Sequence, residues 1–299
     1  MSNFAQSRIE SIGPALLQSG GCDGVYARTA LFEQVMESLL ALISRLREPG
    51  VEILTFPPVM SRQQLEQSGY LHSFPHLLGC VSALQGGESE VRATVAGSNG
   101  RWINSLSATE MVLSPAACYP IYPMVAARQA GSADGLLFDV TSYCFRHEAT
   151  YELDRLQAFR MREYVFIGTG DEALRFRTRW MPRAEELAQC LGLPYKLVTA
   201  SDPFFGRAGQ MAALMQLEQE LKFELLIPVH SQERPTACMS FNYHRDHFGK
   251  AWNLRTNRGD IAHTACIAFG LDRLVLALFA THGLDIKKWP ATAREALTV

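Results

Sequence analysis

The predicted strands of this chain come in pairs with no helix between their members, and this order constrains the fold more than any other feature. One pair covers residues 138–147 and 163–168, and the other covers residues 222–229 and 237–243. Parallel neighbours need a long crossover, usually a helix, whereas antiparallel neighbours do not. The order therefore predicts an α+β fold, with a mostly antiparallel sheet flanked by helices.

A helix, a strand and a proline follow one another near the start of the chain. Residues 31–46 place apolar side chains at helical spacing, and Pro49 with Gly50 ends that helix. A strand is predicted at 51–56 and ends at Pro57. Further predictions are helices at 182–191, 210–221 and 271–279, a strand at 264–269, and a loop-rich region at 61–100.

Composition limits the class of protein. Hydrophobic residues make up 47% of the 299 residues, so the chain can bury a full core, and we expect one domain over residues 1–299. The formal charge is −2 at pH 7. Proteins that hold a long nucleic acid by its phosphates usually carry a clear basic excess. This balance argues against such a partner and leaves only room for a local basic patch.

Two further observations concern location and cofactors. The longest uncharged apolar stretch, residues 111–127, contains three prolines, and the N-terminus has no apolar stretch of signal-peptide length, so we expect a cytoplasmic protein without a membrane segment. The seven cysteines are scattered and odd in number, which favours buried thiols or metal ligands over a disulfide framework. No P-loop or G-x-G-x-x-G motif is present.

The first chemical constellation is Phe145-Arg146-His147-Glu148. Side chains alternate along a strand, so Arg146 and Glu148 are expected on one face. An arginine there can grip a phosphate, and the carboxylate can bind an amino group of a base. Taken alone, the same four residues also fit a surface salt bridge.

The second constellation is Gly270-Leu271-Asp272-Arg273. Helix N-termini favour anions, so an arginine in the first turn of a helix is unusual. Arg273 fits that position if an anion such as a triphosphate binds at the helix end. Its alternative is an exposed arginine whose stem covers apolar surface.

The order of these segments resembles the three motifs of class II aminoacyl-tRNA synthetases. The helix–strand–proline segment resembles motif 1, Phe-Arg-x-Glu motif 2, and Gly-Leu-x-Arg motif 3. Thr109 and Glu110 resemble the Thr-x-Glu loop of the seryl-tRNA synthetases in that class. The resemblance covers about residues 27–290, almost the whole chain. It implies the catalytic core of that class, an ATP site, and a homodimer that buries the apolar stripe of residues 31–46.

The resemblance also implies roles for single residues. Arg146 and Arg273 would be the catalytic pair, holding the α- and γ-phosphates of ATP, and Glu148 would bind the adenine amino group. Ala237 stands where seryl-tRNA synthetases usually carry a glutamate that helps to hold magnesium, so the Mg²⁺ that accompanies ATP would be bound differently here. The other implied ATP contacts are Arg155, Leu156, Phe159, Lys222, Cys238, Met239 and Ser240.

Cys118, Glu163 and Cys266 resemble the zinc ligands of the atypical, methanogen-type seryl-tRNA synthetases. Two thiolates and a carboxylate suit Zn²⁺, and three protein ligands leave one position for a substrate. The resemblance implies one zinc ion per chain that binds the amino group of the amino acid, with Glu163 at the substrate. Each cysteine alone also fits a buried apolar thiol.

A zinc-dependent seryl-type core without room for a tRNA-binding domain before residue 31 resembles the amino acid:[carrier protein] ligases. Such enzymes activate glycine or alanine with ATP and load it onto the phosphopantetheine thiol of a carrier protein, without tRNA. Two alternatives stay open: a truncated seryl-type tRNA synthetase and a catalytically inactive regulatory paralogue. The helix predicted at 210–221 is a candidate surface for the carrier, against the alternative that its Leu and Met residues pack into the core.

Overall fold

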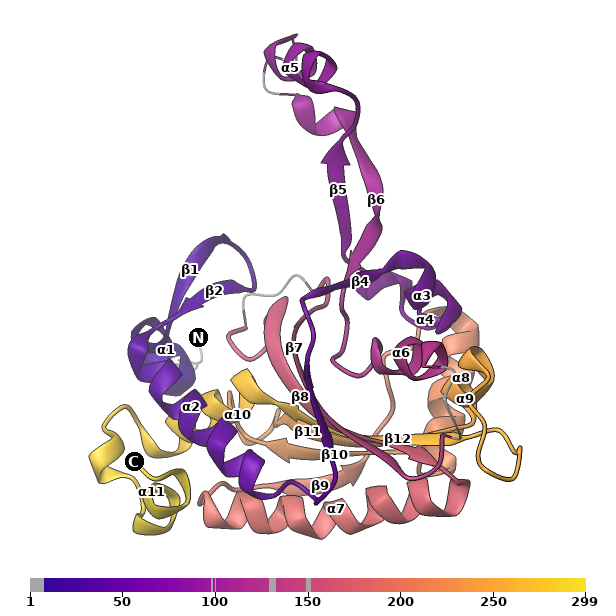
Figure 1. Ribbon diagram of the computed structural model, residues 1–299. Coiled ribbons are helices and arrows are strands. Elements are labelled where there is room, and N and C mark those ends of the chain that lie inside the picture. The colour runs from indigo at the N-terminus through magenta and orange to yellow at the C-terminus, as the bar shows by residue number, and fades with distance from the viewer. Residues whose placement is uncertain (1–7, 98, 100, 129–132, 149–151) are drawn as a thin grey trace.

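A twisted, mostly antiparallel sheet forms the centre of the protein, as seen in a computed structural model that describes residues 8–97, 99, 101–128, 133–148 and 152–299 (Figure 1). Among these residues it has seven strands, and only the edge pair β3–β7 is parallel. The order across the sheet is β3 (Glu52–Thr55), β7 (Leu136–Phe145), β8 (Ala158–Gly168), β12 (His263–Gly270), β11 (Thr236–Arg245), β10 (Lys222–Ile227) and β9 (Lys196–Thr199). The predicted α+β class is confirmed.

The two faces of the sheet pack into two different cores. Along β12, Ala265 and Phe269 join the core that contains α7 (Gly170–Cys190), α10 (Leu271–His282) and α2 (Ala30–Arg45). The alternate residues Cys266 and Ala268 join the core that contains α6 (Ile121–Ala127) and α9 (His247–Trp252). Figure 1 shows α7 running beneath the sheet and α6 above it. This period of two decides which strand residues can reach a site on the α6 side.

Helix α2 agrees with the predicted helix at 31–46, and Thr29 caps its N-terminus. Its apolar stripe, including Phe32, Val35 and Leu39, is buried inside the same chain, where α2 packs on α10. The stripe is therefore not a surface that a second copy could cover, and this argument for a homodimer is wrong. This region also contains the helices α1 (Arg8–Leu16) and α11 (Ala291–Leu297). A small hairpin of β1 (Leu17–Cys22) and β2 (Val25–Arg28) follows α1.

Helix α7 begins twelve residues earlier than the predicted start at Pro182. Thr169 and Glu172 form a reciprocal capping box at its N-terminus, which fixes the start. Phe176 and Trp180 then point into the core at helical spacing. Pro182 lies inside the helix, where tertiary packing outweighs its cost to the hydrogen-bond ladder.

Residues 61–100 are not the loop-rich region that the sequence predicts. They open with β4 (Val59–Ser61) and two short helices, and then enter an arm that projects from the body (Figure 1). The arm is an antiparallel ribbon of β5 and β6 with a helix at its tip. The elements of this region are α3 (Arg62–Gln67), α4 (Tyr70–Ser73), η1 (Pro75–Leu77), β5 (Cys80–Leu84), α5 (Glu88–Gly97), η2 (Trp102–Ser105) and β6 (Leu106–Leu113).

Two elements remain, α8 (Gly206–Glu218) and η3 (Ile286–Lys288). Helix α8 covers most of the helix predicted at 210–221 and leads directly into β10. Among the described residues, no helix combines the length and the apolarity needed to cross a bilayer.

Candidate functional site: a cavity with two chemically different halves

The α6 side of the sheet carries a cavity of about 370 Å³. Its floor consists of residues that the strand register sets side by side: Glu163 of β8 faces Ala268 of β12, and Cys266 of β12 faces Asn242 of β11. Residues Arg146, Glu148, Asp154 and Leu156, the start of α10 and the 202–204 segment close the sides. The cavity therefore brings together residues more than 150 positions apart in the sequence.

One half of the cavity is cationic. Arg146 and Arg273 line it, and both guanidinium groups donate to main-chain carbonyls: Arg146 Nε to Pro115 at 3.1 Å, and Arg273 Nε to Asp154 at 2.8 Å. Within the part of the chain that the structure describes, neither arginine forms an ion pair with a carboxylate. Two half-buried cations without a carboxylate partner among the described residues make this half suited to an anion.

The protonation of Arg273 supports this interpretation. Burial and the positive charge of Arg146 lower the pKa of the Arg273 guanidinium. A bound polyanion would remove this penalty, because an opposite charge favours the protonated form. Phe159 lies beside the pair, with the guanidinium carbon of Arg146 5.5 Å from its ring centroid, so an aromatic face for a base is present as well.

Arg146 and Glu148 both line the cavity, but not for the predicted reason. Strand β7 ends at Phe145, so the two side chains do not share a strand face. The 146–148 segment turns instead, with the Arg146 amide donating to the carbonyl of Gln157 and the Glu148 amide to that of Arg146. Leu156 also lines the cavity. Arg155 does not: its half-exposed side chain lies outside the lining and is 3.6 Å from the Glu148 carboxylate.

Lys222 reaches the cavity from β10 with its charge already neutralised. Its Nζ lies 2.6 Å from the Asp202 carboxylate and 2.9 Å from that of Glu224. Burial would lower the pKa of Lys222, but the two carboxylates raise it above its ordinary value. The sequence gives no signal for Asp202, because it lies in an irregular segment between β9 and α8. Lys222 of β10 is therefore not a free cation for a phosphate group.

Strand β11 supplies the remaining predicted contacts. A bulge opposite Leu225 and Leu226 interrupts the alternation, so consecutive residues of β11 can line the cavity. Burial raises the pKa of the Cys238 thiol to about 12, which keeps it protonated and unreactive at neutral pH. The lining residues of this strand include Ala237, Cys238, Met239, Ser240 and Asn242.

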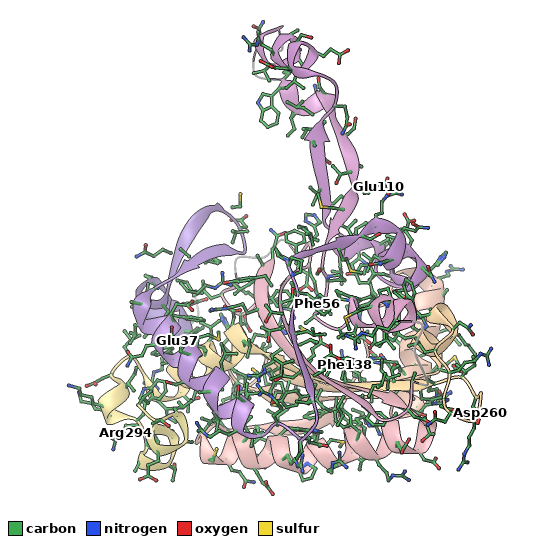
Figure 2. All side chains as sticks on the ribbon, in the orientation of Figure 1. Glu37, Phe56, Glu110, Phe138, Asp260 and Arg294 are labelled. Atoms are coloured by element: carbon green, nitrogen blue, oxygen red, sulfur yellow. The ribbon has the colours of Figure 1, made fainter. Side chains whose placement is uncertain are left out.

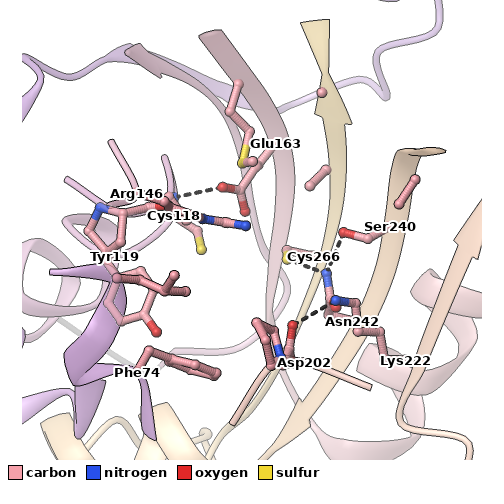
Figure 3. A pocket seen from close by; sticks show the side chains of 18 of the residues that line it. Phe74, Cys118, Tyr119, Arg146, Glu163, Asp202, Lys222, Ser240, Asn242 and Cys266 are labelled. Atoms are coloured by element: carbon pink, nitrogen blue, oxygen red, sulfur yellow. Dashed lines mark hydrogen bonds and ion pairs between the residues drawn. The ribbon is translucent and has the colours of Figure 1, made fainter. Parts of the chain in front are cut away.

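The other half of the cavity contains Cys118, Glu163 and Cys266 (Figure 3). All three are buried, and one ligand atom from each lies within 4.8 Å of the other two. The amides of Ala117 and Cys118 donate to Glu163 Oε1 at 2.8 and 3.2 Å, and Asn242 donates to Cys266 Sγ at 3.3 Å. These contacts fix the donor atoms toward a common point.

This donor set fits a zinc ion. Glu163 is 1% exposed, and among the described residues it forms no ion pair with Lys, Arg or His, so the group lacks a cation. Hydrogen bonding to Cys266, burial and the Glu163 carboxylate raise the pKa of the Cys118 thiol in the metal-free protein. A divalent cation reverses this effect, because coordinating thiols lose their proton. Sulfur and carboxylate donors together favour Zn²⁺.

Thr109 and Glu110 lie outside the cavity, on β6 of the arm. Glu110 is exposed and pairs with Arg62 at 3.1 Å, and Figure 2 shows it at the base of the arm. The structure therefore does not place these two residues, which resemble a Thr-x-Glu substrate loop, with the other site residues. Tyr119, Phe248 and His244 do line the cavity near the trio, although nothing in their local sequence marks them.

No family model matches the chain, but individual known proteins are similar to it. The chain is 57% identical to amino acid–[acyl-carrier-protein] ligase 1 of Bradyrhizobium diazoefficiens, over 97% of its own length and 89% of the relative. It is 28% identical to the type-2 serine–tRNA ligase of Methanopyrus kandleri, over 90% of its own length and 54% of that protein.

Among solved structures, the seryl-tRNA synthetase of M. kandleri in complex with A. aeolicus tRNASec superposes with a TM-score of 0.82 at 24% identity. The superposition covers 98% of this chain and 60% of that one, and it shows a class II synthetase fold. With this fold, and with a relative of that identity along nearly its whole length, the chain belongs to the amino acid–[acyl-carrier-protein] ligases, a family of enzymes.

Proposed function

We propose that this enzyme activates glycine or alanine with ATP to an aminoacyl-adenylate and transfers the aminoacyl group to the phosphopantetheine thiol of a carrier protein. The observation that carries the proposal is the pairing, in one cavity, of a cationic half with a half whose two thiols and carboxylate could hold a metal ion. The first suits the phosphates of ATP, and the second suits the amino group of an amino acid.

The activation step needs alignment and charge compensation but no side-chain nucleophile. The carboxylate of the amino acid attacks the α-phosphorus in line, a new P–O bond forms, and pyrophosphate leaves with the electrons of the broken P–O bond. Arg146 and Arg273 stabilise the charge that develops on the phosphoryl oxygens, and their burial strengthens this effect. Phe159 offers a stacking face for adenine. Mg²⁺ bound with ATP would neutralise further phosphate charge.

Cys118, Glu163 and Cys266 would hold Zn²⁺, which supplies a coordination position for the neutral amino group of the substrate. The walls beside the trio then limit the substrate side chain. Tyr119 and Phe248 pack edge to face with ring centroids 5.6 Å apart, and both line the cavity. We propose that these rings limit the substrate side chain, and hence a preference for glycine or alanine over bulky or charged amino acids.

The transfer step requires a thiol on a flexible arm to reach the adenylate. That thiol attacks the carbonyl carbon, a thioester forms, and AMP leaves. The exposed helix α8 supports a carrier that docks near this cavity: Met211, Leu214 and Met215 are each more than half exposed, and Gly209 is the one buried residue among those described in the helix. The alternative that these side chains pack into the core is wrong.

A direct path connects α8 with the cavity. Gln216 of α8 accepts from the Asp202 amide at 2.6 Å and donates to Asp202 Oδ2 at 2.9 Å. Asp202 in turn binds Lys222 at the cavity wall (Figure 3). A carrier on α8 would therefore contact a helix that is hydrogen-bonded to the cavity wall through Asp202.

Mass spectrometry of a phosphopantetheinylated carrier tests the proposal. Incubation with the enzyme, ATP and glycine or alanine should add one aminoacyl group to the carrier, and hydroxylamine should remove it as expected of a thioester. Charging of a tRNA, with no loading of any carrier from the same genome, would replace the proposal with a truncated seryl-type synthetase. A lack of amino-acid-dependent ATP–pyrophosphate exchange would favour an inactive regulatory paralogue.

The enzyme is further proposed to act as a single catalytic domain, in the cytoplasm, and as a homodimer. The edge strand β3 supports the dimer better than α2 does, because it has a free edge in the seven-stranded sheet and its Ile53 is 57% exposed. Sedimentation equilibrium at micromolar concentration should give twice the mass of the chain. A stable monomer would exclude the dimer.

A further inference from the structure

Asp154 is a buried acidic residue with one oxygen left over. It lines the cavity and is 5% exposed. Its Oδ2 accepts a hydrogen bond from the hydroxyl of Thr236, whereas its Oδ1 is buried and has no hydrogen-bond partner among the described residues. Leaving a buried carboxylate oxygen unsatisfied costs free energy, so such a group calls for a ligand.

The other acidic residues of the cavity are already occupied. Each has at least one charged side chain or a set of main-chain amides against its carboxylate. Glu148 lies 3.6 Å from Arg155, and Asp272 lies 2.9 Å from Arg28. Lys222 lies 2.6 Å from Asp202 and 2.9 Å from Glu224. Glu163, a member of the trio, accepts from two main-chain amides. Within the described part of the cavity, Asp154 is thus the carboxylate that combines burial, no ion pair and an unpartnered oxygen.

Asp154 also lies where the phosphates of ATP are expected. The guanidinium of Arg273 donates through Nε to the Asp154 carbonyl at 2.8 Å and through Nη1 to the Ala237 carbonyl at 3.0 Å. Arg273 is therefore held between Asp154 and Ala237, which lies at the start of β11. That part of β11 has no side-chain carboxylate, because Thr236, Ala237, Cys238 and Met239 follow one another there.

We propose that Asp154 Oδ1 is a protein ligand of the divalent cation that accompanies ATP. The proposal rests on the proposed function, because it needs the triphosphate at Arg146 and Arg273. Mg²⁺ is a hard cation that is usually bound by one or two carboxylates together with phosphate oxygens and water. Thr236 holds the other oxygen and so fixes the carboxylate. Asp154 thus supplies an acidic group that the start of β11 lacks.

Calorimetric titration of ATP into the enzyme without amino acid tests this assignment, because no turnover occurs. Each variant is measured in excess Mg²⁺ and in EDTA. Asp154→Asn keeps the size of the side chain and its contact with Thr236 but removes the charge. Wild-type enzyme should bind ATP more tightly with Mg²⁺ than without it, and the variant should lose about tenfold of this gain. Its affinity for metal-free ATP should stay equal or rise, because a negative charge beside the phosphates is gone.

Asp246→Asn is a matched control, with the same change of charge at a residue outside the cavity that pairs with Lys250. It should leave the Mg²⁺-dependent gain unchanged. Thermal unfolding shows whether the Asp154 variant is folded, and Mn²⁺ bound in the presence of ATP, measured by electron paramagnetic resonance, reports the cation directly.

Three outcomes contradict the assignment in different ways. If Asp154→Asn retains the full Mg²⁺-dependent gain and binds Mn²⁺ with ATP as the wild type does, Oδ1 is not a ligand, while the nucleotide site stands. If the wild type binds no ATP in either condition, the proposed function fails and the cation ligand fails with it. A variant that weakens ATP equally with and without Mg²⁺ would assign Asp154 a purely structural role at Arg273.

Discussion

The two halves of the cavity have opposite deficits. In one half, Arg146 and Arg273 are half-buried cations without a carboxylate partner among the residues that the structure describes. In the other, Cys118, Glu163 and Cys266 converge without a cation. Ion pairs elsewhere in the cavity, such as Lys222 with Asp202, show that the fold can neutralise a buried charge internally. This difference is what we expect if, as proposed, each half is completed by a ligand of its own, an anion in the first and a metal ion in the second.

The halves are neighbours because of the strand register. Glu163 of β8 is paired with Ala268, two residues before the end of β12, and Arg273 enters α10 three residues after that end. Strand β12 thus carries Cys266 of the metal half, and the helix that follows it, α10, carries Arg273 of the cationic half. An amino acid on the metal and a phosphate on the arginine would therefore be adjacent, which is what transfer between them requires.

Removal of one thiol from the metal half should give the largest effect. Cys118→Ser should strip zinc and abolish amino-acid-dependent ATP–pyrophosphate exchange, while ATP binding largely survives, because the cationic half is untouched. Elemental analysis and calorimetry with ATP measure the two halves separately. Full zinc content in this variant would remove Cys118 from the site, and loss of ATP binding would contradict the separation of the halves.

Removal of one cation from the other half should give the converse result. Arg146→Ala and Arg273→Ala should each lower the exchange rate about a hundredfold, corresponding to about 3 kcal/mol of lost transition-state stabilisation. Zinc content and the unfolding temperature should change little. Arg92→Ala, on the exposed arm, is a control that should leave exchange unchanged. Near-normal exchange in both cavity variants would refute the nucleotide site.

A charge on α8 should affect transfer but neither half of the cavity. Leu214→Glu is expected to raise the KM for the carrier about tenfold, since losing one apolar contact at an interface costs on the order of 1–2 kcal/mol. Exchange without carrier should not change. Leu174→Glu places the same charge at an exposed position of α7 and serves as the control. Equal effects of the two variants would exclude α8 as the docking surface.

The smallest effect is expected for a third buried thiol of the same cavity. Cys238 lies on β11 near Arg273 and does not belong to the trio, and burial keeps its thiol protonated. Cys238→Ala should retain zinc and nearly full exchange, and should cost about 1 kcal/mol of stability. Chemical denaturation and elemental analysis measure both. Loss of zinc would show that the metal site extends beyond Cys118, Glu163 and Cys266.

The sequence predicted the sheet class and several of its strands because side-chain periodicity and turn residues are local. It failed where the deciding interactions are elsewhere in the chain. Pro182 indicated a helix start, yet the capping box at Thr169 and the buried Trp180 extend α7 far before it. The arm at 80–113 has little apolar periodicity because its tip packs against no core, so α5 has no buried residue to mark it.

The site shows the same limit. Motif resemblance brought out Cys118, Glu163 and Cys266, which the structure places together, although no spacing in the sequence links them. Arg146 and Glu148 reach the cavity by a turn that strand alternation does not predict. Asp154 and Asp202 were missed because they lie in irregular segments, where a carboxylate has no periodic signal and gains its meaning from partners on β10, β11 and α10.

The most direct test of the two-half cavity is amino-acid-dependent ATP–pyrophosphate exchange with zinc-loaded enzyme, run across the amino acids. Exchange is expected with glycine or alanine, none with bulky or charged amino acids, and none with any of them after zinc is removed by a chelator. Serine is expected to be poor. Exchange that persists at full rate without zinc, or that is fastest with a bulky amino acid, would contradict the two-half cavity.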